Sequence, residues 1–316
     1  MNKGSRVYVA GHRGLVGSAL LRALQAQGFA NLVVRTRSEL DLTRQAEVEA
    51  FFSAERPEYV FLAAAKVGGI VANNTFRAEF IRENLLIAAN VIDAAWHSGA
   101  RRLLNLSSSC VYPRLAPQPL REEYLWSGPL EPTNQPYAVA KLAAMEMVQA
   151  YRDQYGADYF SVLPTNLYGP NDNYDPESSH LLPALIHKIH SAKSAGASTV
   201  RLWGTGTPRR EFMYVDDMAE ACLLLMERYD GSSPINVGVG EDRSVRELAE
   251  MVARLLGYQG SFEFDPKKPD GTPRKLMDVT RLKGLGWAPK TSLEDGVQRA
   301  YQAYLETRGK VAAERK

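Results

Sequence analysis

The feature that most constrains the fold is a glycine turn close to the N-terminus. An apolar segment at residues 6–10 runs directly into the string GHRGLVG at residues 11–17, and a helical pattern covers residues 16–27. Small residues let the backbone approach a pyrophosphate, and the N-terminus of the following helix favours an anion. The alternative is a plain tight turn. The predicted dinucleotide site consists of Gly11, His12, Arg13, Gly14, Leu15, Val16 and Gly17.

Strand-like apolar runs recur along the first half of the chain. They lie at residues 32–34, 59–64, 102–107 and 159–163, with helical stretches between them. Strands that alternate with helices predict a parallel sheet covered on both faces. Since such crossovers are right-handed, the expected fold is an α/β, doubly wound Rossmann domain.

The length of 316 residues suggests two lobes. The alternation of strands and helices weakens after position 170, although 212–226 resembles a core helix and 235–239 a strand. We therefore expect a dinucleotide-binding domain at 1–170 with returns near 212–240. A smaller α/β substrate domain is expected within 171–316, interrupted by those returns.

A proline-rich segment separates two of the regular elements. Residues 113–136 contain six prolines, so they predict a long loop instead of a helix or strand. A loop of this length inside a compact domain often serves function.

Composition excludes several classes of function. The net charge of +2 offers no broad basic field, so we expect no nucleic-acid partner. Two cysteines, Cys110 and Cys222, cannot make a disulfide framework or a four-cysteine metal site. No apolar run is long enough to span a bilayer, and residues 1–5 lack a signal-peptide layout. The expectation is a soluble, cytoplasmic protein without a metal site or membrane contact.

The end of the second predicted strand bears on the choice of cofactor. Arg35 and Arg37 stand there, with no acid before Glu39, and Arg13 lies in the glycine turn. Guanidinium groups suit a ribose 2′-phosphate, which an acid would repel, so NADP(H) is favoured over NAD. The alternative is that these arginines are solvated surface residues. Asp41 is a further candidate for the adenine end.

A second motif pairs Tyr137 with Lys141. Four residues apart on a helix, the two side chains share one face. An ammonium nearby is expected to lower the pKa of the tyrosine from its usual value of about 10. Lys141 can also hold the nicotinamide ribose. Serines at residues 107–109 follow a buried strand, where a hydroxyl can orient a substrate carbonyl. Alone, the spacing of tyrosine and lysine often arises by chance.

The glycine turn, the serine-rich strand end and the Tyr-x-x-x-Lys motif, in this order, resemble the extended short-chain dehydrogenase/reductase family. Longer strings at residues 63–74, 108–113, 164–170 and 268–275 resemble the GDP-L-fucose synthase family within it. The resemblance runs from position 7 to about position 287. It implies that Ser108 is the catalytic serine, whereas the residue before it is often a glycine and is a serine here.

This resemblance implies an activity. The family epimerises GDP-4-keto-6-deoxy-D-mannose at C3 and C5 and reduces C4 with NADPH, which yields GDP-L-fucose. It implies Cys110 and His180 as the acid and base, and their ordinary pKa values of about 8.5 and 6.5 suit that work. Further cofactor contacts are implied for Arg37, Asp41, Leu42, Ser107, Lys141, Pro164, Thr165, Asn166, Leu167 and His180. The implied contacts of the GDP-sugar are Lys188, Trp203, Arg210 and Asp270.

Other interpretations remain open from the residues alone. A lone cysteine is usually a small hydrophobe, and His180 can simply cap a helix. The chain can instead be another nucleotide-sugar epimerase, dehydratase or 4-reductase, or a non-catalytic NADP-binding regulator. Cys222 is expected in the core, and His97 and His190 at the surface.

Two helical stretches predict an oligomer. Residues 137–155 and 85–96 carry apolar side chains on more than one face. A helix that is apolar on two sides must bury both. We expect a homodimer in which these helices form a four-helix arrangement, and the resemblance implies the same.

Overall fold

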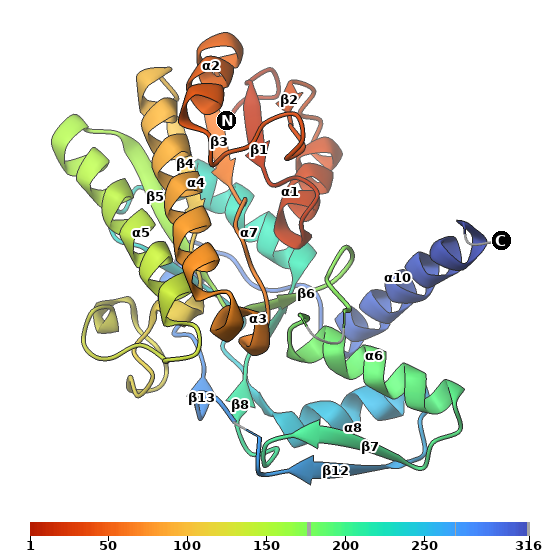
Figure 1. The fold of residues 1–316 in the computed structure, drawn as a ribbon. Coiled ribbons are helices and arrows are strands. Elements are labelled where there is room, and N and C mark those ends of the chain that lie inside the picture. Colours follow the sequence, from red (N-terminus) through yellow and green to blue (C-terminus); the bar gives the residue numbers. More distant parts are fainter. Residues whose placement is uncertain (176–177, 269, 315–316) are drawn as a thin grey trace.

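The computed structural model describes residues 1–175, 178–268 and 270–314, and it contains a parallel sheet in the order β10-β5-β4-β3-β1-β2 (Figure 1). Neighbouring strands in this sheet all run parallel. The chain places β2 on one side of β1 and β3 on the other, so the strand order reverses at β1. This confirms the doubly wound fold and puts a ligand crevice at the carboxyl ends of β1 and β3. The strands are β1 (Val7–Ala10), β2 (Leu32–Val33), β3 (Tyr59–Leu62), β4 (Arg102–Leu106), β5 (Asp158–Pro164) and β10 (Ile235–Val237).

Helices cover both faces of this sheet. On one face α1 (Leu15–Ala26) packs beside α7 (Val215–Arg228). On the other face α4 (Arg77–His97) lies between α2 (Gln45–Glu55) and α5 (Gln135–Tyr155), as Figure 1 shows. Because both faces are buried, most residues of the strands are apolar.

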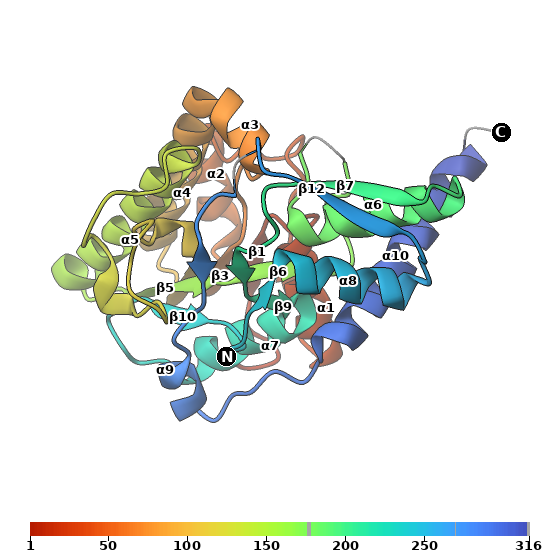
Figure 2. The same ribbon diagram turned by 90° about the horizontal axis from the view of Figure 1, so that it is seen from below.

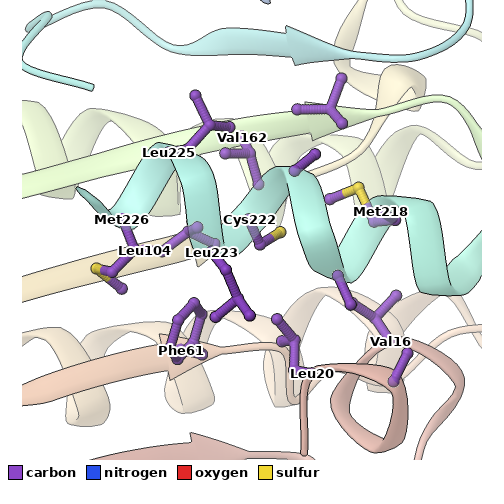
Figure 3. Close-up of a cluster of buried hydrophobic side chains, with 14 of the residues drawn as sticks. Val16, Leu20, Phe61, Leu104, Val162, Met218, Cys222, Leu223, Leu225 and Met226 are labelled. Carbon is purple, nitrogen blue, oxygen red and sulfur yellow. The ribbon is translucent and has the colours of Figure 1, made fainter. Parts of the chain in front are cut away.

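The core on the α1–α7 face is continuous across the sheet. Phe61 and Leu104 from the strands meet Leu20 of α1 and Leu223 of α7 (Figure 3). Cys222 lies fully buried in the same cluster, which confirms its predicted place in the core.

The first predicted return to the sheet region begins differently from the expectation. Residues 212–226 do not form one helix: β9 (Phe212–Tyr214) pairs in parallel with β6 (Asn166–Tyr168), and α7 begins only at Val215. All three residues of β9 are buried, so strand pairing overrides the helical pattern there. The chain also returns to this region a further time, which was not predicted: Leu282 and Trp287 pack into the α1–α7 core.

A second lobe has its own apolar core. In it α6 (Leu181–Ser194), α8 (Val245–Leu256) and α10 (Leu293–Glu314) pack near a ribbon of β7 (Thr199–Trp203) and β12 (Ser261–Asp265). The start of α8 carries a capping box, in which the side chain preceding the helix and a glutamate in its first turn bond reciprocally.

A small sheet, β11-β8-β13, lies between the two lobes, and Figure 2 shows β13 close to the proline-rich loop. That loop is largely irregular, although it contains the short helix η2 (Glu122–Tyr124) and its last two residues begin α5. It contacts the chain beyond β13 through a bridge between Leu120 and Met277. The remaining elements are α3 (Ile70–Thr75), η1 (Ser109–Val111), η2 (Glu122–Tyr124), β8 (Arg209–Arg210), β11 (Arg243–Ser244), β13 (Arg274–Lys275) and α9 (Thr280–Gly284).

Within the described ranges, no helix combines the length and apolar character needed to cross a membrane. Over the same ranges, no group of three or more histidine, cysteine, aspartate or glutamate residues is arranged to hold a metal ion.

The sheet core gives a stability prediction. Leu104 is 1% exposed at the centre of the cluster, so Leu104→Ala should lower the free energy of unfolding by about 2–5 kcal/mol. Leu115 is 81% exposed, so Leu115→Ala should change it by less than about 0.5 kcal/mol. Urea denaturation of the three proteins checks this, and equal losses in both variants would contradict the assignment of the core.

Candidate active site

The glycine turn forms a close-packed cradle at the carboxyl end of β1. Gly11 has a φ of +84°, and a Cβ on it would lie 2.8 Å from the Ala64 backbone. A Cβ on Gly17 would lie 2.1 Å from the Gly11 carbonyl oxygen, so only glycine fits there. Gly14 precedes α1 and offers no side-chain cap, and the first turn of the helix holds no acid. The N–H groups of that turn are thus available to an anion.

The residues around the cradle differ in how free their charges are. Arg35 is engaged in an ion pair with Glu55. Arg13 and Arg37 are exposed at the rim, and the side chain of Arg37 is 73% exposed although it pairs with Glu83 at 3.3 Å. Glu39 accepts hydrogen bonds from the backbone and side chain of the residue three positions before it, which ties its carboxylate to its own turn. Beside the cradle, the ring Nδ1 of His12 is buried without a hydrogen-bond partner.

Other predicted cofactor residues serve local contacts. Asp41 accepts hydrogen bonds from the Thr43 N–H at 3.0 Å and hydroxyl at 2.8 Å, and the backbone bond is the main cause of its lowered pKa. Thr165 and Asn166 both donate to the carbonyl of Glu211, at 3.2 and 2.7 Å. Leu42 and Leu167 are partly buried against the two sheet cores, and Pro164 ends β5.

Ser108, Tyr137 and Lys141 come together at the carboxyl end of β4. Ser108 shares a hydrogen bond with the Tyr137 hydroxyl, and its oxygen accepts the Cys110 N–H at 3.2 Å. The Lys141 Nζ donates to the Leu106 carbonyl at 2.8 Å and lies 6.0 Å from the centroid of the Tyr137 ring. The preceding serine, Ser107, points elsewhere because its hydroxyl contacts Met145 in the core, so its side chain does not join this group.

The prediction that the pKa of Tyr137 is lowered is wrong, because its pKa is raised. Burial raises the pKa of Tyr137, the charge of Cys110 raises it further, and the Ser108 hydrogen bond opposes both. The Lys141 ammonium is turned toward a main-chain carbonyl and not toward the phenol. Burial also lowers the pKa of Lys141 to about 8. Desolvation is the largest cause of both shifts, and Lys141 is not among the causes that act on Tyr137.

Cys110 and His180, 70 positions apart in sequence, border the same cation. The Lys275 Nζ donates to the Cys110 sulfur at 3.4 Å. His180 precedes α6 and is open to solvent on one side. Surrounding protein atoms and, after them, the charge of Lys275 lower its pKa. The Gly69 N–H donates to the Ser178 carbonyl at 2.9 Å, which ties the segment before His180 to the loop after β3.

Sequence reasoning missed Lys275 as a site residue. Lys275 is the last residue of the string at 268–275, which is one of the strings that carry the family resemblance. Its place in that string was the signal that could have identified it.

The four residues expected to bind the GDP-sugar lie on the second lobe and its border. Trp203 is 49% exposed, and its ring faces two ammonium groups, Lys188 at 5.9 Å and Lys268 at 5.3 Å. Burial lowers the pKa of Lys188. An exposed indole between two cations is suited to a flat, anionic ligand.

Arg210 and Asp270 are neighbours on the same border. The Arg210 Nη2 donates to the Asp270 carbonyl at 3.3 Å, and burial lowers the pKa of the guanidinium. The Asp270 carboxylate accepts two bonds from Thr205, at 2.8 Å from the N–H and 2.9 Å from the hydroxyl. The arginine is thus held in place by backbone carbonyls, and the aspartate shapes the loop beside it.

The two histidines predicted at the surface differ. His97 is 72% exposed, which confirms the prediction. For His190 the prediction is wrong, because it is half-buried with its Nδ1 2.8 Å from the Tyr301 hydroxyl of α10. The packing of α6 against α10 covers the face of α6 that carries His190, which the local sequence does not indicate.

A glycine cradle, a Ser-Tyr-Lys group beside it and a second lobe over the crevice define a nucleotide-binding enzyme of the short-chain dehydrogenase/reductase type. The family model for the NAD dependent epimerase/dehydratase family matches residues 7–239.

Comparison with individual proteins narrows this class. The chain is 57% identical to GDP-L-fucose synthase 1 of Arabidopsis thaliana, over 96% of this chain and 94% of the relative. It is 52% identical to the GDP-L-fucose synthase of Escherichia coli, over 95% and 97%. The solved structure of a GDP-L-fucose synthetase from Naegleria fowleri bound to NADP is 28% identical, with a TM-score of 0.90 over 98% of this chain and 96% of that one. The chain belongs to the NAD dependent epimerase/dehydratase family and, within it, to the GDP-L-fucose synthases.

The buried lysine gives a pH-dependent prediction. The pKa of Lys141 is about 8 in the fold against 10.5 for an ordinary lysine. Between these values the unfolded chain holds a proton that the fold lacks, so stability rises with pH across that interval. Below pH 8, holding Lys141 charged inside the fold lowers the free energy of unfolding by about 3 kcal/mol. A variant without the lysine avoids this loss but also gives up the hydrogen bond to the Leu106 carbonyl, so its net gain is smaller.

Lys141→Met should therefore be more stable than the parent by about 1–2 kcal/mol at pH 7, with the difference shrinking toward pH 10. Urea denaturation at both pH values measures it. The exposed Lys283→Met serves as the control and should show no such difference. A Lys141→Met variant that is less stable at pH 7 would show that the hydrogen bond outweighs the burial of the charge.

Proposed function

We propose that this chain converts GDP-4-keto-6-deoxy-D-mannose to GDP-L-fucose, by epimerisation at C3 and C5 followed by NADPH-dependent reduction at C4. The observation that carries the proposal is that Lys275 donates a hydrogen bond to the Cys110 sulfur while its charge also acts on His180, beside the Ser108–Tyr137 pair. A simple reductase has no use for a second acid/base pair next to its tyrosine. The more than 50% identity to proteins named for this product supports the same reading.

NADP(H) fits the cradle. Because Gly11 and Gly17 carry no side chain, the turn packs tightly against the neighbouring backbone. A pyrophosphate can then lie close to the main chain over the uncapped start of α1. Arg13 and Arg37, exposed at the rim, are suited to a ribose 2′-phosphate. When bound, NADPH supplies the hydride for C4. Asp41, Leu42, the backbone of Ser107 and the 164–167 segment are proposed to line the rest of this site.

The residues at the end of β4 perform the reduction step. Ser108 orients the C4 carbonyl, and the Tyr137 hydroxyl gives its proton to the C4 oxygen as C4 is reduced. Lys141 holds the nicotinamide ribose and lies beneath the tyrosine ring. The resulting alcohol is the product hydroxyl, so the tyrosine must regain a proton before the next turnover.

Cys110 and His180 perform the epimerisations. Protons at C3 and C5 are acidic because the C4 carbonyl stabilises the enolate that forms. One group removes a proton from one face, and the other returns a proton to the opposite face, which inverts the centre. In the first step the base gains the proton, and in the second the acid gives one up, so charge balances over each inversion.

The second lobe is proposed to hold the nucleotide. Arg210 and Lys188 are suited to the diphosphate, and Trp203 offers a flat apolar face to the nucleotide. Asp270 is placed to accept hydrogen bonds from the base or ribose. In this division, residues 1–170 with the returns near 212–240 bind the cofactor, and the rest of 171–316 binds the GDP-sugar.

A homodimer is proposed through the outer faces of α4 and α5. An apolar stripe there contains Leu85 and Ala89 of α4 and Val139, Ala143 and Met147 of α5, of which Leu85 and Val139 are 37% and 38% exposed. Burial of this stripe against a second copy would complete a four-helix arrangement. A cytoplasmic location is proposed because both cysteines are free thiols.

The activity is tested by mixing the protein with NADPH and GDP-4-keto-6-deoxy-D-mannose and identifying the sugar product. We expect GDP-L-fucose, and tighter binding of NADPH than of NADH. In Cys110→Ser, incorporation of solvent deuterium at C3 and C5 should fall about 10²-fold while NADPH binding is retained.

A product reduced at C4 with unchanged C3 and C5 would instead assign the parent chain to the simple 4-reductases. Tyr137→Phe is the matched control for the other half of the site, since it should lose reduction and keep deuterium incorporation. NADPH binding without consumption in the parent would favour a different sugar substrate or a regulatory role.

The assembly is tested by light scattering at micromolar concentration. Met147→Glu places a charge on the apolar stripe and should halve the measured mass. Lys283→Glu, on the exposed side of α9, should leave the mass unchanged. A parent protein of monomer mass would overturn the proposed dimer.

A further inference from the structure

Lys275 stands on a backbone that is fixed from both sides. Its carbonyl accepts the Glu211 N–H at 3.3 Å, and it is paired in register with Arg210 across β8 and β13. On the other side, the Leu276 carbonyl accepts the N–H of Leu120, from the proline-rich loop, at 2.6 Å. A side chain that starts from so constrained a backbone has a restricted reach.

The Lys275 ammonium acts on both residues proposed for epimerisation. The Lys275 Nζ lies 3.4 Å from the Cys110 sulfur, and its charge acts on His180. Arg210 and Tyr137 also face Cys110. Of these groups, Lys275 is the one with a hydrogen bond to the sulfur and an effect on the histidine as well.

We propose that Lys275 is a positioning residue for epimerisation, which aims the Cys110 sulfur at the sugar and places one positive charge where it acts on both Cys110 and His180. This inference rests on the proposed function for its chemistry, although its effect on Cys110 does not depend on the substrate.

The physical basis is one charge acting on two neighbours. An ammonium beside a sulfur favours the thiolate, which is the form that accepts a proton. The same positive charge disfavours the imidazolium of a nearby histidine. The Lys275 ammonium therefore acts on both proposed acid/base groups at once. Proton removal at one face of the sugar and delivery at the other are then linked through a single side chain.

The first experiment compares the parent, Lys275→Met and Lys275→Arg in D₂O with GDP-4-keto-6-deoxy-D-mannose and NADP⁺. Lys275→Met should lower deuterium incorporation at C3 and C5 at least about tenfold, because the hydrogen bond to the Cys110 sulfur and the positive charge acting on His180 are lost together. Lys275→Arg keeps the charge and should recover most of the rate. NADPH affinity should be the same in all three. Incorporation at the parent rate in Lys275→Met, or equal failure of both variants with intact NADPH binding, would overturn the proposal.

The second experiment needs no substrate, so it separates this inference from the proposed function. Alkylation by iodoacetamide at pH 7 reports Cys110, because Cys222 is fully buried. Lys275→Met should slow the alkylation of Cys110 several-fold, Lys275→Arg should slow it less, and the control Lys283→Met should leave it unchanged. An unchanged alkylation rate in Lys275→Met would overturn the proposal. A parent that is alkylated as expected but incorporates no deuterium would refute the proposed function instead.

Discussion

The interactions of Glu211 join the two halves of the site. Its side chain is fully buried, and its carboxylate accepts hydrogen bonds from the N–H groups of Gly240 and Met277, at 2.9 and 2.7 Å. Its carbonyl accepts bonds from Thr165 and Asn166, which follow β5. One residue thereby fixes the end of the large sheet, the strand after it and the backbone beyond β13. Burial raises the pKa of this carboxyl to about 7, against the opposing effect of its backbone bonds.

This arrangement explains how an open crevice keeps a defined geometry. The sheet supplies Ser108 at the end of β4, the helix α5 supplies Tyr137 and Lys141, and the small sheet supplies Arg210 and Lys275. Each of these elements is short or has its end at the crevice, so none of them fixes the positions of its site side chains without help from the others. Backbone hydrogen bonds between segments distant in sequence do that work.

Much of the fold was predictable because its signals are local. The glycine turn fixes β1 and α1, since Gly17 cannot carry a Cβ there, and apolar runs fix the other strands. The spacing of Tyr137 and Lys141 was enough to place them on one helix face. The residues predicted at the end of β4 also come together, apart from the side chain of Ser107, which the core captures.

What failed depends on tertiary contacts. No local pattern links His180 to Cys110, because their shared neighbour Lys275 comes from β13 and the segment before His180 is held by a loop contact at Ser178. The split at 212–226 arises from pairing with β6, and the sign of the Tyr137 pKa shift arises from burial that spacing cannot measure. Lys275 was likewise invisible as a site residue until its neighbours were known.

The parallel register of β8 and β13 has a consequence for how such an enzyme changes. Arg210, suited to the nucleotide diphosphate, and Lys275, which touches Cys110, are partners in that ladder. In the proposed function, binding of the nucleotide diphosphate and inversion of the sugar carbons are therefore mechanically linked. A lineage that loosened this ladder to accept a different nucleotide would disturb its stereochemistry in the same step, so new specificities are more accessible through the exposed Trp203 end of the lobe than through Arg210.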